Sequence, residues 1–154
     1  MFSVAIIAVG KMRNASYRSE FDEYVKRARA FAKLEIIEVP AVPFRNDGEI
    51  GRAKDGEGVA IKKALEKRTG PIYLLDERGR SMDSFAFAEM LHKSSEHITF
   101  VIGGTAGLSD ELKRSYSAIS LSSMTLPHEL ARVMLSEQIY RAVTLGQERG
   151  KYHY

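Results

Sequence analysis

Apolar residues along this chain occur in short continuous runs separated by stretches of helical spacing. Residues 2–9 (FSVAIIAV) and 98–102 (ITFVI) have the length of buried strands, and each run is followed by glycine. Pro40 ends a third run. Together the runs predict five strands, at residues 2–9, 34–39, 72–76, 98–102 and 118–122.

Helices are predicted between these strands. Apolar side chains recur every three or four residues among charged neighbours at Tyr17, Phe21, Tyr24, Val25 and Ala28. After an irregular segment at 41–58, a second helix is predicted at residues 59–67. A third is predicted at 84–93, capped by Ser84, with Phe85, Ala88 and Leu91 facing inward. Two more are predicted, one starting at Ser109 and one at 127–145 with Pro127 in its first turn.

Alternating strands and helices predict an α/β fold, with a mostly parallel sheet and helices on both faces. The length of 154 residues fits a single domain. Ligands of such sheets bind beyond the carboxyl ends of the strands. The loops at residues 76–83, 103–109 and 122–127 are therefore the expected site.

Composition narrows the function classes. The chain has no cysteine, which excludes disulfides, thiolate zinc sites and cysteine nucleophiles. No run approaches the roughly 20 apolar residues of a membrane span, and the start has neither a basic lead-in nor a cleavage site. We therefore expect a cytoplasmic protein with no membrane association. The net charge of +3 is compatible with an anionic partner such as RNA.

The first two of these loops each contain candidate ligand-binding residues, and the third belongs to the segment described below. In IGGTAGLS, at 102–109, Gly103 and Gly104 would let a ligand approach the backbone, although a tight turn explains them equally well. The segment is neither GxGxxG nor a phosphate loop, so neither a dinucleotide nor a triphosphate site is supported. In LDERGRSMDS, at 75–84, Asp76 could accept a hydrogen bond from a ribose or an amine, but an ordinary charged loop is the simpler interpretation.

The segment at 120–142 (SLSSMTLPHELARVMLSEQIYRA) is the most informative. Ser122, Ser123 and Thr125 place hydroxyl groups in a loop at a strand end. In the helix that follows, His128 and Arg132 share a face, and Glu137 can pair with Arg141. An arginine on a mostly apolar helix requires a partner or an anionic ligand. The helix is apolar on more than one face, which predicts a buried or interface position.

The tail GKYHY, at 150–154, places Tyr152 and Tyr154 around His153. Aromatic rings can stack on bases, and histidine can exchange protons near neutral pH. A docked or frayed tail is the alternative.

Together these motifs closely resemble the RlmH family, the SPOUT-class methyltransferases of 23S ribosomal RNA that act on N3 of a pseudouridine. The matching segments are LDxxG at 75–79, IGGxxG at 102–107, SLSxMTLPHxLARVxLxEQxYRA at 120–142, and the closing Tyr-His. The resemblance covers nearly the whole chain. The chain departs from the family's pattern at Lys151 and Tyr154.

This resemblance implies S-adenosylmethionine as cofactor, a trefoil knot near the C-terminus, and a homodimer whose tail completes a shared active site. It also implies 23S ribosomal RNA as the partner, which we expect to be methylated within the assembled ribosome, and no metal. The cofactor residues that we expect are Leu75, Asp76, Gly103, Gly104, Leu121, Ser122, Ser123, Met124, Thr125 and Leu126.

For catalysis we expect His153 as proton acceptor, with His128 as second choice. Tyr152 would stack on a base, and Arg132 and Arg141 would bind phosphate or stabilise charge on the base. The alternatives are a non-catalytic RNA-binding module and a nucleotide-dependent small-molecule enzyme. The RNA-binding module would need no adenosine pocket, and the missing GxGxxG argues against the nucleotide-dependent enzyme.

Overall fold

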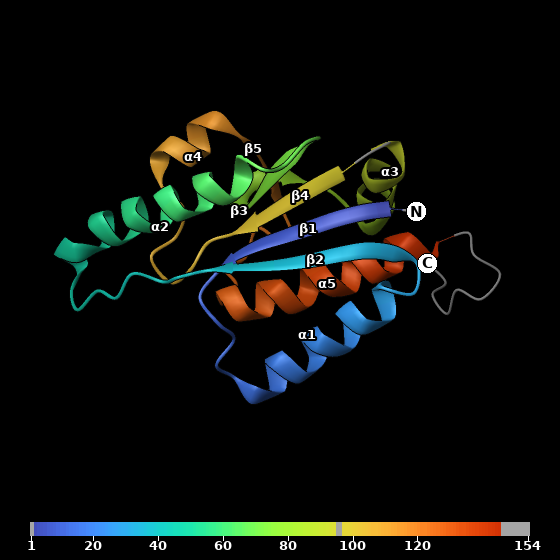
Figure 1. The fold of residues 1–154 in the computed structure, drawn as a ribbon, viewed down its shortest axis with the longest axis horizontal. Coiled ribbons are helices and arrows are strands. Elements are labelled where there is room, and N and C mark those ends of the chain that lie inside the picture. The colour runs from blue at the N-terminus through green and yellow to red at the C-terminus, as the bar shows by residue number, and fades with distance from the viewer. Residues whose placement is uncertain (1, 95–96, 146–154) are drawn as a thin grey trace.

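Five parallel strands form the centre of the protein in the computed structural model, which describes residues 2–94 and 97–145 (Figure 1). The sheet has the order β2-β1-β4-β3-β5, and each neighbouring pair is parallel. The strands are β1 (Phe2–Val9), β2 (Ala32–Val39), β3 (Ile72–Ser81), β4 (His97–Ile102) and β5 (Ser117–Ser120). The helices are α1 (Ala15–Ala28), the 3-10 turn η1 (Asp47–Glu49), α2 (Ile50–Leu65), α3 (Ser84–Lys93), α4 (Asp110–Ser115) and α5 (His128–Thr144).

Helices cover both faces of the sheet, as the sequence predicts. On one face α1, α3 and α5 pack against alternate residues of β1, such as Val4 and Ile6. On the other face α2 and α4 pack against Ile7 and Val9 (Figure 1). Because both faces of β1 are covered, the strand is a continuous apolar run rather than an alternating one.

Helix α2 begins nine residues earlier than the sequence pattern predicts. The irregular segment expected at 41–58 contains the first half of this helix, although it includes Gly51, Gly56 and Gly58. Two of these glycines make close contacts possible. A Cβ on Gly56 would lie 3.1 Å from a Val42 methyl group, and one on Gly58 would lie 2.8 Å from the Ser109 hydroxyl. Packing therefore outweighs the low helix propensity of glycine here.

Strand β3 is longer than predicted, because it resumes after an interruption. Leu75 and Arg80 both pair with Ile119 of β5, so residues 76–79 are looped out of the ladder. Gly79 closes this loop against β5, where a Cβ would lie 2.6 Å from the carbonyl carbon of Ala118. The expected strand end at Asp76 is thus the start of a bulge, and β5 ends at Ser120 rather than at residue 122.

Two details of α3 differ from the prediction. Asp83 caps the helix, accepting the Ala86 N–H at 2.8 Å, in place of Ser84. Phe85 is exposed, and Phe87 packs into the core instead, with Ala88 and Leu91 as predicted. Starting the helix at Ser84 directs its core face toward residues 87, 88 and 91.

Helix α5 has its apolar faces covered largely from within the chain. It packs on α1 and α3, burying residues such as Leu135, Ile139 and Val143. Its predicted extent is correct to within one residue at each end, and Pro127 immediately precedes its first turn. Within the described residues, no helix is both long and apolar enough to cross a lipid bilayer.

Candidate active site

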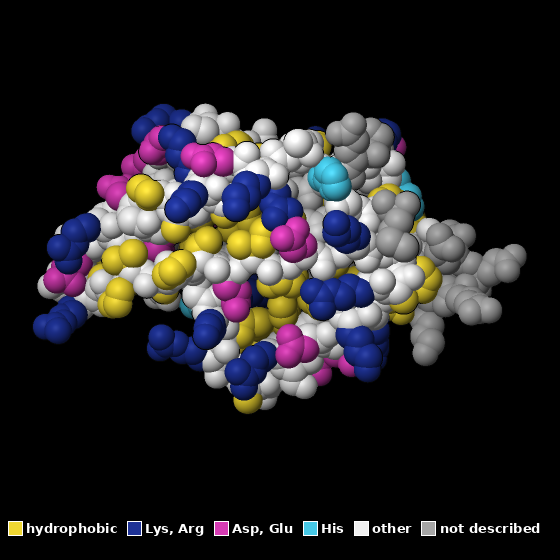
Figure 2. Space-filling view, in the orientation of Figure 1, with side chains coloured by type: hydrophobic (Ala, Val, Ile, Leu, Met, Phe, Trp, Pro, Cys, Tyr) yellow, Lys and Arg dark blue, Asp and Glu magenta, His cyan; other side chains and the backbone are white. Residues whose placement is uncertain are grey.

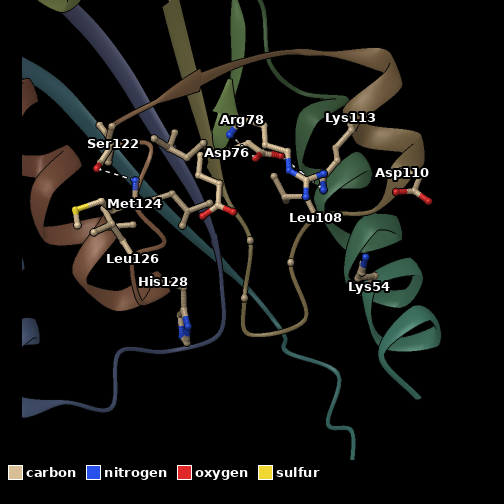
Figure 3. Close-up of a pocket in the computed structure, with 18 residues that line it drawn as sticks. Lys54, Asp76, Arg78, Leu108, Asp110, Lys113, Ser122, Met124, Leu126 and His128 are labelled. Atoms are coloured by element: carbon tan, nitrogen blue, oxygen red, sulfur yellow. Dashed lines mark hydrogen bonds and ion pairs between the residues drawn. The ribbon is translucent and has the colours of Figure 1, made fainter. Parts of the chain in front are cut away.

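A cavity of about 520 Å³ lies where the carboxyl ends of β3, β4 and β5 meet, and we call it the cofactor cavity (Figure 3). All three loops that the sequence analysis selected contribute to it. Eight of the ten expected cofactor residues line it, namely Leu75, Asp76, Gly103, Gly104, Leu121, Ser122, Met124 and Leu126. Parallel strands bring these residues together although up to 51 positions separate them in the chain.

The remaining two expected residues, Ser123 and Thr125, are exposed and do not line the cavity. The Thr125 hydroxyl donates to the Glu77 carboxylate at 2.6 Å, which ties the loop after β5 to the bulge in β3. The Ser122 hydroxyl accepts the Met124 N–H at 3.0 Å. Both hydroxyls therefore order the loop. Ser122 still lines the cofactor cavity as expected, whereas Thr125 does not.

Asp76 is the first residue of the bulge in β3 and is only partly exposed. One carboxylate oxygen accepts the Arg78 N–H at 2.9 Å, and the other lies 3.6 Å from the Lys113 ammonium group. A carboxylate has about four lone-pair sites. Asp76 can therefore hold the bulge and still accept a hydrogen bond from a hydroxyl or ammonium group in the cavity.

The glycine segment forms a tight turn. The Gly107 N–H donates to the Gly104 carbonyl at 3.0 Å, and Gly107 has a φ of 84°. A Cβ on Gly104 would lie 2.9 Å from a Val9 methyl group, and one on Gly103 would lie 3.0 Å from Leu108. Packing within the protein thus already requires glycine at positions 103 and 104, and the same packing leaves their backbone facing the cavity.

Charged residues that the sequence analysis did not select complete the lining. Lys54 and Lys113 lie on the α2 and α4 side, with Asp110, while Ser122, Met124 and Leu126 lie opposite (Figure 3). Lys54 was missed because α2 was expected to start only at residue 59. Glu77 and Arg78 lie inside the loop at 76–83 that the sequence analysis selected, so their position in that loop could have identified them as lining residues.

His128, at the start of α5, lines the cofactor cavity. Burial lowers the pKa of its imidazole, and the Arg132 charge lowers it further, against the opposing effect of Glu129. The neutral ring, which can accept a proton, is therefore favoured at neutral pH.

Arg132 does not face a ligand. Its side chain is fully buried, and its guanidinium donates to the carbonyl oxygens of Val9 and Gly10 and to the Glu38 carboxylate. The expectation that it binds an RNA phosphate fails in this structure, because the side chain is buried and its two terminal nitrogens donate to internal acceptors, while the buried Nε has no hydrogen-bond partner. Arg132 instead fixes the end of β1 to α5.

Arg141 pairs with Glu137 as predicted, with its Nε 3.1 Å from the carboxylate. It stands 13 residues beyond His128, or about 20 Å along the helix axis at 1.5 Å per residue, and it does not line the cofactor cavity. Within one protomer it therefore cannot act at the same point as His128. Tyr152 and His153 lie outside the described residues.

The sequence matches the family model described as "Predicted SPOUT methyltransferase" over residues 2–153. Ribosomal RNA large subunit methyltransferase H of Bacillus cytotoxicus is 40% identical, over 98% of this chain and 99% of the relative. The protein of that name from Bacillus thuringiensis is 38% identical over the same shares. The chain belongs to this SPOUT methyltransferase family. The resemblance noted in the motifs is thereby confirmed, and the chain is a methyltransferase.

Solved structures share the SPOUT fold at low sequence identity. A Bacillus anthracis chain described as an RNA methyltransferase superimposes with a TM-score of 0.57 at 14% identity, over 97% of this chain and all of that one. A Legionella pneumophila methyltransferase, solved with its bound cofactor SAM, gives a TM-score of 0.51 at 10% identity, over 90% of this chain and 65% of that one. These likenesses support the α/β fold class predicted from the sequence.

Proposed function

We propose that this SPOUT methyltransferase transfers the methyl group of S-adenosylmethionine to N3 of a pseudouridine in 23S ribosomal RNA. The observation that carries the proposal is the cofactor cavity, in which eight residues selected from the sequence meet at one sheet edge. The names of the relatives support ribosomal RNA as the substrate.

The lining fits the chemical groups of S-adenosylmethionine. Leu75, Leu108 and Leu126 provide apolar contacts for an adenine ring, and Asp76 can accept from a ribose hydroxyl or from the ammonium group. Lys54 and Lys113 can face the carboxylate of the methionine part. The volume of about 520 Å³ lies within the ~300–1,000 Å³ of small-molecule sites.

The cofactor supplies an activated methyl group, so the protein's residues have to orient the acceptor nitrogen and remove its proton. His128 is the candidate proton acceptor that the described residues provide. We propose His153 as the first candidate and Tyr152 as a base-stacking residue, contributed by the tail of a partner in a homodimer. The trefoil knot, the cytoplasmic location and the ribosome-bound substrate belong to the same proposal and are supported by the family.

The surface charge supports a substrate that is recognised by shape as well as by charge. Lysine and arginine side chains are spread among acidic ones on the face shown in Figure 2 rather than gathered in one patch. With a net charge of +3, neutralisation of phosphates alone would capture free RNA weakly. An assembled particle offers more contact surface, so we expect ribosomes to be better substrates than free RNA.

Calorimetry with S-adenosylmethionine tests the cofactor assignment. Lys54→Glu should raise Kd by about 10- to 100-fold, because a hydrogen bond to a charged group contributes about 1.5–3 kcal/mol. The matched control, Lys63→Glu, changes an exposed lysine of the same helix that does not line the cavity and should bind normally. Wild-type protein that binds no S-adenosylmethionine would favour the non-catalytic RNA-binding alternative.

Mass spectrometry of ribosomal RNA tests the reaction. A strain that lacks the gene should lose methylation of one pseudouridine, and purified enzyme with S-adenosylmethionine should restore it on isolated ribosomes. An unchanged methylation pattern in the deletion strain would reject the proposed substrate.

A further inference from the structure

Glu57, in α2, is a buried carboxyl group with unused hydrogen-bonding capacity. It is 3% exposed. Its Oε2 accepts the Val42 N–H at 2.9 Å, whereas Oε1 has no hydrogen-bond partner. Within residues 2–94 and 97–145, no lysine, arginine or histidine forms an ion pair with it. Burying a carboxyl group in this way is costly, and such groups concentrate at functional sites.

Glu57 is part of the wall of a second cavity, of about 420 Å³, at the carboxyl ends of β1, β2 and β4. Three loops and two helices form this second cavity. Besides Glu57, its lining includes Lys11, Arg13, Ala41, Phe44, Gly104 and His128.

The second cavity adjoins the cofactor cavity. Gly104 and His128 line both. A Cβ on Gly104 would lie 3.6 Å from Oε1 of Glu57, so this glycine stands beside the unused oxygen. A ligand in the second cavity would therefore lie next to one in the cofactor cavity, as the two substrates of a transfer reaction must.

The second cavity has features that suit a nucleotide. Lys11 and Arg13 are exposed at its edge and can face phosphate, and Phe44 offers a half-buried aromatic ring. The wall near Arg13 is fixed, because the Glu129 carboxylate accepts the backbone N–H groups of Arg13 at 2.7 Å and Asn14 at 3.1 Å. Glu129 is only partly buried, whereas Glu57 is the buried carboxyl group of this wall and has an oxygen without a hydrogen-bond partner.

We propose that the second cavity receives the target nucleobase, and that Glu57 donates a hydrogen bond to the ring carbonyl oxygen beside the nitrogen to be methylated. This inference rests on the proposed function. Burial raises the pKa of the Glu57 carboxyl group and so favours the protonated form, which can donate. The other charged and titratable groups that line the second cavity are Lys11, Arg13, His128 and Glu129.

The proposed hydrogen bond would assist the transfer electrostatically. N3 gives its proton to the protein's proton acceptor, and the negative charge spreads onto the ring carbonyl oxygens that neighbour N3. N3 then forms a bond to the methyl carbon while the bond from that carbon to sulfur breaks, leaving its electron pair on sulfur. Glu57 keeps its own proton throughout. A donor aimed at a developing oxyanion lowers the barrier most when it is held in place by the protein.

Three variants and a control test this role, using ribosomes from a strain that lacks the gene. Glu57→Gln retains a neutral donor and should keep kcat/KM within about 3-fold, whereas Glu57→Leu should lower it by about 10- to 100-fold. Ala41→Trp, which fills the second cavity from an exposed position, should raise KM by about 10-fold or more. The control is Glu66→Leu, at an exposed site that follows α2, and should behave as wild type.

Calorimetry separates this inference from the proposed function. All four variants should bind S-adenosylmethionine with wild-type Kd. Wild-type protein that neither binds the cofactor nor methylates ribosomes would overturn the proposed function itself. An active wild type with an equally active Glu57→Leu would overturn the role of Glu57. If Glu57→Gln loses as much activity as Glu57→Leu, the claim that Glu57 acts as a neutral hydrogen-bond donor is wrong. If Ala41→Trp has normal kinetics, the claim that the second cavity binds the nucleobase is wrong.

Discussion

Replacing Arg132 by methionine should destabilise the protein by about 3 kcal/mol. The side chain is fully buried and holds the carbonyl oxygens of Val9 and Gly10. Each buried carbonyl that loses its donor costs about 1–3 kcal/mol. The third partner, Glu38, is 38% exposed and can be rehydrated, so it adds little. The loss of the donor to the buried Val9 carbonyl and to the partly buried Gly10 carbonyl, with methionine filling most of the volume, together gives about 3 kcal/mol.

Urea unfolding followed by circular dichroism measures this loss, since the chain has no tryptophan to report by fluorescence. With m of about 2 kcal/mol per M, the midpoint should fall by about 1.5 M. All samples should have the same protein concentration, because association would shift the midpoint.

Arg27→Met provides the control for Arg132→Met. Arg27 forms an ion pair with Glu23 on α1 but is 48% exposed, so its loss should cost less than about 1 kcal/mol. Equal losses in the two variants, or a loss below about 1 kcal/mol for Arg132→Met, would refute the reasoning that the buried guanidinium holds β1 to α5.

Three further predictions concern stability, geometry and the tail. Burial raises the pKa of Glu57, so just above pH 4.5 the folded protein binds more protons than the unfolded one, and wild-type stability falls as the pH rises. In thermal melts, Glu57→Gln should therefore be more stable than wild type at pH 8. This difference in stability should shrink towards pH 4. Gly79→Ala should cost about 2–4 kcal/mol in urea unfolding, since its Cβ would meet Ala118 at 2.6 Å; a neutral effect would show that the bulge can relax. Deleting residues 151–154 should leave cofactor binding by calorimetry intact and lower methyl transfer by about 100-fold or more, and wild-type turnover would exclude the tail from the active site.

The elements that the sequence predicted well are those whose signal is local. The runs at 2–9 and 98–102 are apolar except for Ser3 and Thr99, because helices cover both faces of the sheet, and Ser109 caps α4 as predicted. The start of α2 was missed because two of its glycines, Gly56 and Gly58, are explained by contacts with Val42 and Ser109, which lie elsewhere in the chain. The second half of β3 depends on pairing with Ile119, about 40 residues away.

The site shows the same division. The rule that ligands bind at the carboxyl ends of parallel strands located the three loops correctly, and eight of the ten cofactor residues expected from the family motif line the cofactor cavity. The sequence indicated that Arg132 needs a partner, but it could not distinguish an anionic ligand from the carbonyl groups of residues 9 and 10. Glu57 carried no sequence signal at all, because a glutamate among lysines and glycines is typical of an exposed helix.

The contact between Arg132 and the end of β1 also has a consequence for biosynthesis. The arginine follows Gly10 by 122 positions in the chain. At about 5–20 residues per second, the ribosome takes roughly 6–24 s to add the partner that the first strand requires. Strand β1 also waits for β4, because it lies between β2 and β4 in the sheet. During translation the nascent chain can pair β1 with β2, but the other edge of this apolar strand stays unpaired for seconds until β4 is made, and we expect chaperone binding in that interval to raise the yield of native protein.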